Sequence, residues 1–399
     1  MKEKLIIRNF GPIKDVELEF KRFNVLIGEQ ATGKSTVVKL LAACRYFSNL
    51  VGKNGKDNQS FEFGLYDWGL GNYWGTNTYI RYECEHYNLT VNSEFEENPT
   101  FNIDSHEHEG VQSVPILLSE LEPKSLPFKN LLSELNKIKP QDNPIELVDQ
   151  SNWLIPSSFY QNDVASVLDN PYFFYTERAL QSIFSLGKNN IPNLSDTLFN
   201  YFDKTFFIQS NFYKNETDIE PLGIKYKNIN GQGFIKTEKH DFISLSNSAT
   251  GFQSAIPIVL LMNYYSNIKK RKKTFIIEEP EINLFPSTQN KLIQFIVDKT
   301  MNYGNTTLIT THSPYILTSL NNLIYANKVG AIHHQKVNKI VPEKCWLNSN
   351  EISAYQLLSN GRALNIIDKE EHIIEADRID DISNSLNIDF DKLFELESL

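Results

Sequence analysis

The sequence has few of the residues that would suit an oxidising or lipid environment. It holds 3 cysteines in 399 residues, and they lie far apart, at Cys44, Cys84 and Cys345. This spacing fits neither a disulfide framework nor a metal or redox motif, so we expect reduced thiols and a cytoplasmic protein. No window approaches the ~18 uninterrupted apolar residues of a membrane span, and the apolar run near the N-terminus is too short for a signal peptide. We therefore expect no membrane partner.

Positive charge is also scarce, because the formal net charge is −10 at pH 7. Bulk charge of this sign disfavours a protein that coats nucleic acid. One local basic run remains at residues 269–273. A solvated loop is the simpler interpretation of this run, and contact with nucleic acid or a partner protein is the alternative.

The sequence is well supplied with the apolar residues of a large core. Hydrophobic residues make up 41% of it and aromatic residues 12%, and the length is typical of two or three domains. Strand-like runs at residues 172–175, 274–277 and 307–310 alternate with helical patterns. This alternation predicts an α/β fold with a largely parallel sheet. Residues 5–7 and 16–20 predict a hairpin at the start, and residues 79–95 predict a further pair of strands.

Residues 28–35 read GEQATGKS and match the pattern G-x-x-x-x-G-K-[ST] without a mismatch. A buried strand is predicted just before this loop and an apolar helix just after it, which is the context in which the pattern cradles phosphates. Backbone N–H groups of the loop and the helix start would face the phosphates. A chance glycine turn is the alternative, and the complete pattern in this context disfavours it. The residues expected to contact the nucleotide are Gly28, Glu29, Gln30, Ala31, Thr32, Gly33, Lys34, Ser35 and Thr36.

Within this loop two side chains have specific chemistry. Lys34 would reach the β- and γ-phosphates, and the Ser35 hydroxyl would bind Mg²⁺. ATP and Mg²⁺ are therefore the expected cofactors.

Two other predicted strands end in residues suited to nucleotide chemistry. Glu278 and Glu279 follow one of them, and His312 follows the other. Ligands of open α/β sheets bind outside the carboxyl ends of the strands, so we expect all three residues near the loop. Glu278 would hold Mg²⁺ directly or through water, Glu279 would activate the attacking water, and His312 would contact the γ-phosphate.

Residues 248–253, SATGFQ, open an apolar helix predicted over 256–265. Ser248 or Thr250 would cap this helix, and a capped helix start is also a place where anions bind.

In chain order, these motifs resemble the ABC-type ATPases of the SMC/RecF/OLD superfamily, in particular stand-alone bacterial members labelled AAA-type. The resemblance covers residues 1–45, 172–186 and 240–320. Residues 5–36 look like the N-terminal lobe with Walker A, and FYTERAL at 174–180 looks like the Y-x-P-x-E-R strand end of that group. IIEEPEINLFP at 276–286 is similar to Walker B with the D-loop, and TTHSP at 310–314 is similar to the switch-histidine segment.

This resemblance implies a P-loop NTPase head of the ABC type, with a mixed, largely parallel sheet and an inserted α+β region. The implied domains are an N-terminal lobe at 1–48, the inserted region at 49–239, a C-terminal lobe at 240–330 and a small extension at 331–399 that completes the head. The first Walker B acid is Glu278 where aspartate is more usual. No Q-loop glutamine is recognised, and Gln161 is a poor candidate.

The resemblance also implies a second subunit. Ser248, Thr250 and Gly251 stand where the family has its signature motif, with a register that SATGFQ leaves open by one position. They would contact the γ-phosphate bound by the other copy. Two ATP molecules would thus be sandwiched in a head-to-tail homodimer, or in a higher oligomer, and hydrolysis would open it.

The segment after Pro314 is short, with a strand expected at 329–333 and helices near 352–359 and 369–376. Asp389-Phe390-Asp391 favours a surface role over a metal site, so we expect no nuclease in this chain. The leading hypothesis is an ATPase that gates a separately encoded nuclease or toxin in a bacterial antiviral defence or DNA-transaction system. The alternatives are a RecF-like DNA-repair ATPase, with DNA contacted by the inserted region and the basic run, and a nucleotide-switched binding module with little turnover. A transporter ATPase is disfavoured because the inserted region is misplaced for one.

Overall fold

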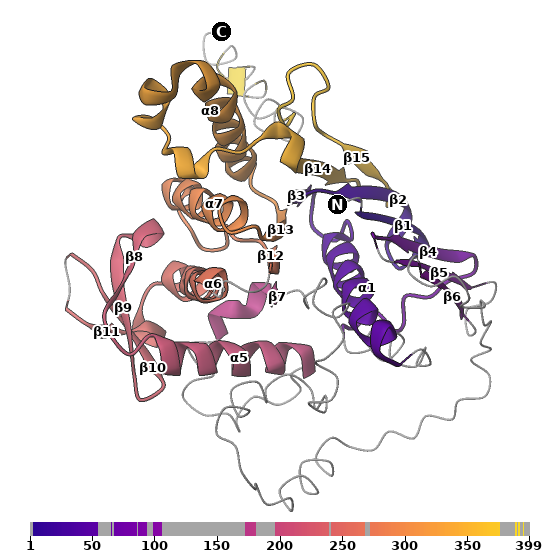
Figure 1. Ribbon diagram of the computed structural model, residues 1–399, viewed down its shortest axis with the longest axis horizontal. Coiled ribbons are helices and arrows are strands. Elements are labelled where there is room, and N and C mark those ends of the chain that lie inside the picture. The colour runs from indigo at the N-terminus through magenta and orange to yellow at the C-terminus, as the bar shows by residue number, and fades with distance from the viewer. Residues whose placement is uncertain are drawn as a thin grey trace, which may run out of the picture.

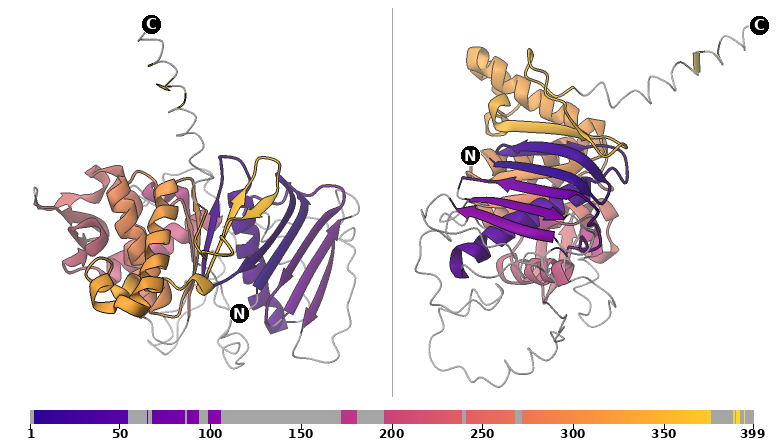
Figure 2. Two further views of the ribbon diagram at one scale, coloured as in Figure 1. Left: turned by 90° about the horizontal axis from the view of Figure 1, so that it is seen from above. Right: turned by 90° about the vertical axis from the view of Figure 1, so that its right-hand side faces the viewer.

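The computed structural model describes residues 3–54, 65, 68–85, 87–93, 99–105, 172–180, 196–238, 241–267 and 272–375, and also residues 388, 390, 391 and 394. These residues form a central sheet with helices on both of its faces (Figures 1 and 2). A second, antiparallel sheet lies next to the helix on one face, and a small third sheet lies beside the helices on the other face. Among the described residues, no helix has both the length and the apolar character needed to cross a membrane.

The central sheet has six strands in the order β15-β14-β3-β13-β12-β7. Five of them run parallel, and β15 alone is antiparallel to its neighbour. Every residue of β3 is buried, as expected of a parallel strand covered on both faces. The predicted α/β fold with a mixed, largely parallel sheet is confirmed. The strands are β3 (Phe23–Ile27), β7 (Tyr172–Phe174), β12 (Thr274–Glu278), β13 (Thr306–Thr311), β14 (Ile352–Leu357) and β15 (Ala363–Asn365).

Helix α1 (Lys34–Asn54) covers one face of this sheet, and the helices of the second half of the chain cover the other (Figure 1). These are α6 (Thr250–Asn267), α7 (Pro286–Met301) and α8 (Pro314–Asn338), with α5 (Asp196–Phe212) packed on α6. Helix α6 is apolar almost all round, and this suits its buried position. Short 3₁₀ segments follow some strands, among them η5 (Thr176–Leu180) and η7 (Leu245–Asn247).

The predicted N-terminal hairpin is confirmed and belongs to a five-stranded antiparallel sheet, ordered β2-β1-β4-β5-β6. Its strands are β1 (Glu3–Phe10), β2 (Ile13–Phe20), β4 (Thr78–Glu83), β5 (Tyr87–Ser93) and β6 (Pro99–Ser105). A buried ion pair fastens α1 to this sheet, because Arg45 donates two hydrogen bonds of 2.6 Å to Glu3. Segment 49–239 thus supplies strands to both the N-terminal sheet and the central sheet.

A third, small antiparallel sheet lies beside α5 and α6 (Figure 1), with the order β11-β10-β9-β8. Its strands are β8 (Thr217–Ile219), β9 (Ile224–Ile229), β10 (Gln232–Lys236) and β11 (Ile243–Ser244). The chain leaves this sheet through η7 and enters α6 directly.

Three expectations for the C-terminal part are wrong. Residues 329–333 belong to α8, where Gly330 lets the Trp346 ring pack so closely that a Cβ would lie 2.3 Å from it. Residues 352–357 form β14, because β3 offers a parallel edge that satisfies their backbone groups. Residues 369–375 form turns closed by a bridge between Ile367 and Ile374. Gln161, residues 269–271 and Asp389 lie outside the described residues.

Candidate active site

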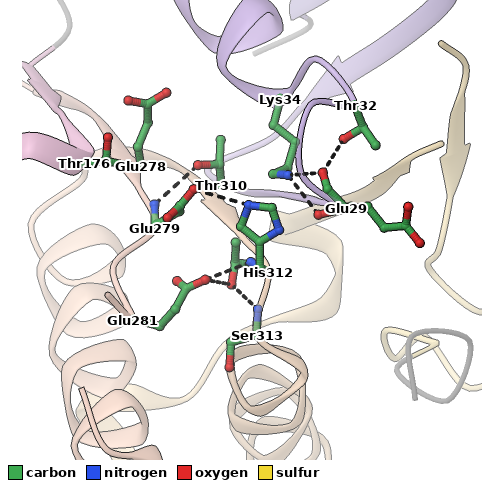
Figure 3. A network of polar contacts seen from close by, with 12 residues as sticks. Glu29, Thr32, Lys34, Thr176, Glu278, Glu279, Glu281, Thr310, His312 and Ser313 are labelled. Carbon is green, nitrogen blue, oxygen red and sulfur yellow. Dashed lines mark hydrogen bonds and ion pairs between the residues drawn. The ribbon is translucent and has the colours of Figure 1, made fainter. Parts of the chain in front are cut away.

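The loop of residues 28–33 joins β3 to α1 at the carboxyl edge of the central sheet (Figure 3). Glycine is needed at Gly28 and Gly33 because atoms of neighbouring segments lie too close to leave room for a side chain. A Cβ at Gly28 would lie 2.4 Å from the carbonyl oxygen of Leu357, and one at Gly33 would lie 2.5 Å from Cδ1 of Ile13. Gly33 also has φ of +94°, which favours glycine. The loop is therefore wedged between the β1–β2 turn and the end of β14.

Lys34 lies over this loop and is nearly buried. Its Nζ donates hydrogen bonds to the carbonyl oxygens of Gly28, at 2.8 Å, and Glu29, at 2.7 Å. Burial lowers the pKa of Lys34, while the negative charges of Glu279, Glu281 and Glu278 act in the opposite direction. An ammonium group carries three donors, so one remains for an oxygen of a bound phosphate.

Glu278, the last residue of β12, is 3% exposed and lies next to the side chain of Ser35. Burial raises the pKa of Glu278, and the nearby Ser35 hydroxyl lowers it in part. Its Oε1 atom is buried without a hydrogen-bond partner among the described residues. A buried carboxylate oxygen in need of a partner, next to a hydroxyl, fits a Mg²⁺ ion. That ion would take its other ligands from phosphate and water, since the described part of the chain has no cluster of three or more metal-binding side chains.

Glu279 follows in an uncommon backbone conformation, with φ of +43°. Its N–H donates to the Thr310 carbonyl at 2.9 Å, which ties it to β13. One carboxylate oxygen, Oε1, lies 3.3 Å from Nε2 of His312, and both side chains are about a third exposed. The acid and the imidazole therefore face each other at the open edge of the sheet (Figure 3).

A third acid, Glu281, fixes the backbone of His312 and has no role assigned from the sequence. Its Oε1 accepts hydrogen bonds from the Thr311 hydroxyl, at 2.7 Å, and from the His312 N–H, at 2.8 Å. Burial raises the pKa of Glu281, and these two bonds lower it in part. The only signal in the sequence is the acid run itself, in which Glu281 is the third carboxylate.

The residues at the start of α6 lie apart from this group. The Ser248 hydroxyl donates to the Leu245 carbonyl at 2.7 Å. Thr250 begins the helix, and a Cβ at Gly251 would lie 2.6 Å from the carbonyl oxygen of Asn283. The helix start therefore packs against the segment that follows the acid run. That segment follows β12, and β13 lies between β12 and β3, the strand that leads into the loop of residues 28–33.

The structure thus brings together Lys34, Ser35, Glu278, Glu279 and His312, as the sequence predicts. It packs the start of α6, with Ser248, Thr250 and Gly251, against the segment that follows β12. The first group can neutralise phosphate charge, hold a divalent cation and orient a water molecule.

A family model described as an AAA ATPase domain matches residues 1–107 and 77–317. No curated protein matches the sequence. Among solved structures, the chain is similar to the SMC head domain from Thermotoga maritima, with 10% identity, coverage of 80% of this chain and 91% of that chain, and a TM-score of 0.37.

Two further structures are an Smc head bound to the C-winged helix domain of ScpA and, from Pyrococcus furiosus, an Smc head with an extended coiled coil bound to the C-terminal domain of ScpA. The first has 11% identity, a TM-score of 0.43 and coverage of 93% of this chain and 98% of that chain. The second has 8% identity, a TM-score of 0.40 and coverage of 91% of this chain and 96% of that chain. With identities and TM-scores this low, the family is assigned by the match to the family model.

Proposed function

This chain belongs to the family of AAA ATPase domains, and we propose that it binds ATP with Mg²⁺ and hydrolyses it to ADP and phosphate. The observation that supports this most strongly is the pairing of Glu279 with His312, 3.3 Å apart, at the same sheet edge as the loop that carries Lys34. Two groups suited to act on water therefore lie beside a loop suited to hold phosphates.

In this proposal the phosphates lie along the loop, where backbone N–H groups and the start of α1 favour negative charge. The remaining proton of Lys34 binds a phosphate oxygen. Ser35 and Glu278 would hold Mg²⁺, which would neutralise charge on the phosphates. A bound ion would also give the buried Oε1 of Glu278 the partner that it lacks among the described residues.

Glu279 is the proposed residue that orients the attacking water and accepts its proton. Its carboxylate is accessible, and its backbone is held by the bond to Thr310. His312 faces Glu279 and contacts the γ-phosphate. Loss of that phosphate therefore changes the contacts of the His312 imidazole. Glu281 keeps the backbone of His312 in place.

We further propose that two copies form a head-to-tail dimer in which the start of α6 serves the ATP of the other copy. Strand β12 is two strand spacings from β3, or about 10 Å. Because Gly251 packs against the segment that follows β12, we do not expect Ser248, Thr250 and Gly251 to bind the phosphate held by their own loop. A helix start with small polar residues is nonetheless suited to an anion, which a second copy would supply.

The test is Glu279→Gln, compared with Glu371→Gln, an exposed acid paired with Lys328 far from the site. We expect Glu279→Gln to abolish phosphate release, to keep ATP binding and to accumulate an ATP-bound dimer in sedimentation experiments. Glu371→Gln should behave like the wild type. Normal hydrolysis by Glu279→Gln would refute the catalytic assignment.

For the biological role, we propose that this cycle gates a separately encoded nuclease or toxin in a defence or DNA-transaction system. The net charge of −10 supports a protein partner over bulk binding to DNA. Titration of duplex DNA with the ATP-bound Glu279→Gln protein at about 50 mM and about 200 mM salt tests this. Salt-sensitive binding would favour the DNA-repair alternative, and ATP-driven dimerisation without turnover in the wild type would favour the binding-module alternative.

A further inference from the structure

Arg178, in η5 just after β7, is fully buried. A charged group in such a place is normally paired with a carboxylate. Among the described residues its hydrogen bonds go instead to four main-chain carbonyl oxygens. Burial lowers the pKa of Arg178, and the nearby acids Glu281, Glu279 and Glu278 act in the opposite direction. The guanidinium remains protonated, since arginine keeps its proton in proteins.

Two of these bonds hold the main-chain carbonyl groups of the acid pair at the end of β12, Glu278 and Glu279. Nη1 donates to the Glu278 carbonyl at 2.7 Å, and Nη2 donates to the Glu279 carbonyl at 2.6 Å. The N–H of Glu279 is bonded to Thr310. The peptide groups on both sides of Glu279 are therefore held, which maintains its uncommon φ of +43° and the direction of its carboxylate.

The other two bonds reach different elements. Nε donates to the Ser254 carbonyl, 2.9 Å away in the first turns of α6, and Nη1 also donates to the Tyr175 carbonyl at 3.0 Å. One rigid, planar group thus joins the end of β7, the end of β12 and the start of α6. A lysine carries a single nitrogen and cannot reproduce this fork.

We propose that Arg178 is a positioning residue that sets the direction of Glu279 and fixes it to the start of α6. This inference rests on the proposed function, in which Glu279 acts on the ATP of its own chain and the start of α6 acts on that of the other copy. A shift of α6 when it meets the partner's nucleotide is then carried by Arg178 to the acid of its own site.

A purely structural role is the competing explanation, and Arg22 provides a matched control. Its Nη2 also donates to two successive carbonyls, those of Thr300 and Met301, at 2.9 and 2.8 Å. These lie at the end of α7, away from the acid pair. Replacing Arg22 removes these two bonds and an ion pair with Glu351 without touching Glu279.

The experiment compares Arg178→Lys and Arg178→Gln with Arg22→Gln in the full chain. Because a misplacement of about 1 Å can cost about 100-fold in rate, we expect both Arg178 variants to lower kcat about 10- to 100-fold and to leave KM for ATP within about threefold. The lysine variant keeps the positive charge, so a fall in its kcat would come from the lost geometry of the guanidinium hydrogen bonds. Amide hydrogen exchange without nucleotide should rise in both 250–256 and 278–282, and in neither segment for Arg22→Gln.

Each outcome decides one question. A wild-type protein without ATPase activity above that of Glu279→Gln refutes the proposed function, and the exchange measurement still tests the link. If the wild type is active and Arg178→Lys keeps its kcat, the positioning role is wrong. It is also wrong if exchange rises throughout the molecule, or in only one of the two segments, since a link between them requires both to change together.

Discussion

The Oε1 atom of Glu281 accepts the main-chain N–H of His312 at 2.8 Å and the hydroxyl of Thr311 at 2.7 Å. Two segments that follow neighbouring parallel strands are joined by this carboxylate. His312 is thereby held at 3.3 Å from Glu279 by an acid whose own carboxylate points toward the backbone of the His312 segment (Figure 3).

Replacing Glu281 with alanine should therefore impair turnover without impairing ATP binding. The His312 N–H and the Thr311 hydroxyl lose their acceptor, and the imidazole moves relative to Glu279. We expect kcat to fall about 10-fold or more, with little change in the dissociation constant of ATP measured by calorimetry. Glu281→Gln keeps an acceptor oxygen at the same place and should be milder. Equal activity of the alanine variant and the wild type would contradict this role.

Glu278→Gln should stabilise the protein in a pH-dependent way. Burial raises the pKa of Glu278 above its ordinary value of 4.5, so the folded protein binds this proton more tightly than the unfolded chain. The resulting stability is present at low pH and is lost as the pH rises through the raised pKa. The gain in Tm of Glu278→Gln over the wild type should be larger at pH 8 than at pH 5.

The same variant should lose the stabilisation that Mg²⁺ with ATP gives to the wild type, because the proposed carboxylate ligand is gone. Exposed Glu371→Gln is the control for both measurements. A Tm difference that is independent of pH would show that the pKa of Glu278 does not differ between the folded protein and the unfolded chain.

Lys34→Ala should lose ATP affinity, and with it ATP-driven dimerisation and turnover. A hydrogen bond to a charged group contributes about 1.5 to 3 kcal/mol, so we expect affinity to fall about 10- to 100-fold. Binding of a fluorescent ATP analogue and sedimentation with ATP are the measurements. Lys328→Ala, which removes an exposed lysine paired with Glu371, should change neither. A dimer that still forms with ATP at the wild-type concentration would be inconsistent with the proposed role of the loop.

Gly251→Ala should separate the two halves of the proposed composite site. Its Cβ would lie 2.6 Å from the carbonyl oxygen of Asn283, so the start of α6 must move. We expect ATP binding by the monomer to be unchanged, and dimerisation and kcat to fall about 10-fold. Gly75→Ala, where the nearest atom would be 3.4 Å away, is the control. Wild-type turnover by Gly251→Ala would remove the start of α6 from the proposed site.

The sequence predicts the parts of this site that depend on short segments of chain. The loop with Lys34 and Ser35 has a complete local pattern, and Glu278, Glu279 and His312 directly follow apolar strands. Parallel strands bring such residues to one edge of a sheet. This is why the grouping of these five residues follows from the order of the motifs.

What escapes prediction depends on contacts between distant segments. The bond from Arg178 to the Glu278 carbonyl joins residues 100 positions apart, and the motif FYTERAL around Arg178 does not indicate this partner. The acceptor role of Glu281 likewise depends on how β12 and β13 pair. Residues 352–357 have apolar residues that suit a helix as well as a strand, and the free edge of β3 decides between them.

The place of β14 has a practical consequence for cutting the chain into fragments. The match to the AAA ATPase domain ends at residue 317. Strand β14, which follows that residue, lies next to β3, and its Leu357 carbonyl packs closely against Gly28. A fragment that stops at the end of the match would leave β3 as a bare, apolar sheet edge, which invites aggregation. We therefore expect a stable fragment of this domain to extend through β14 and β15.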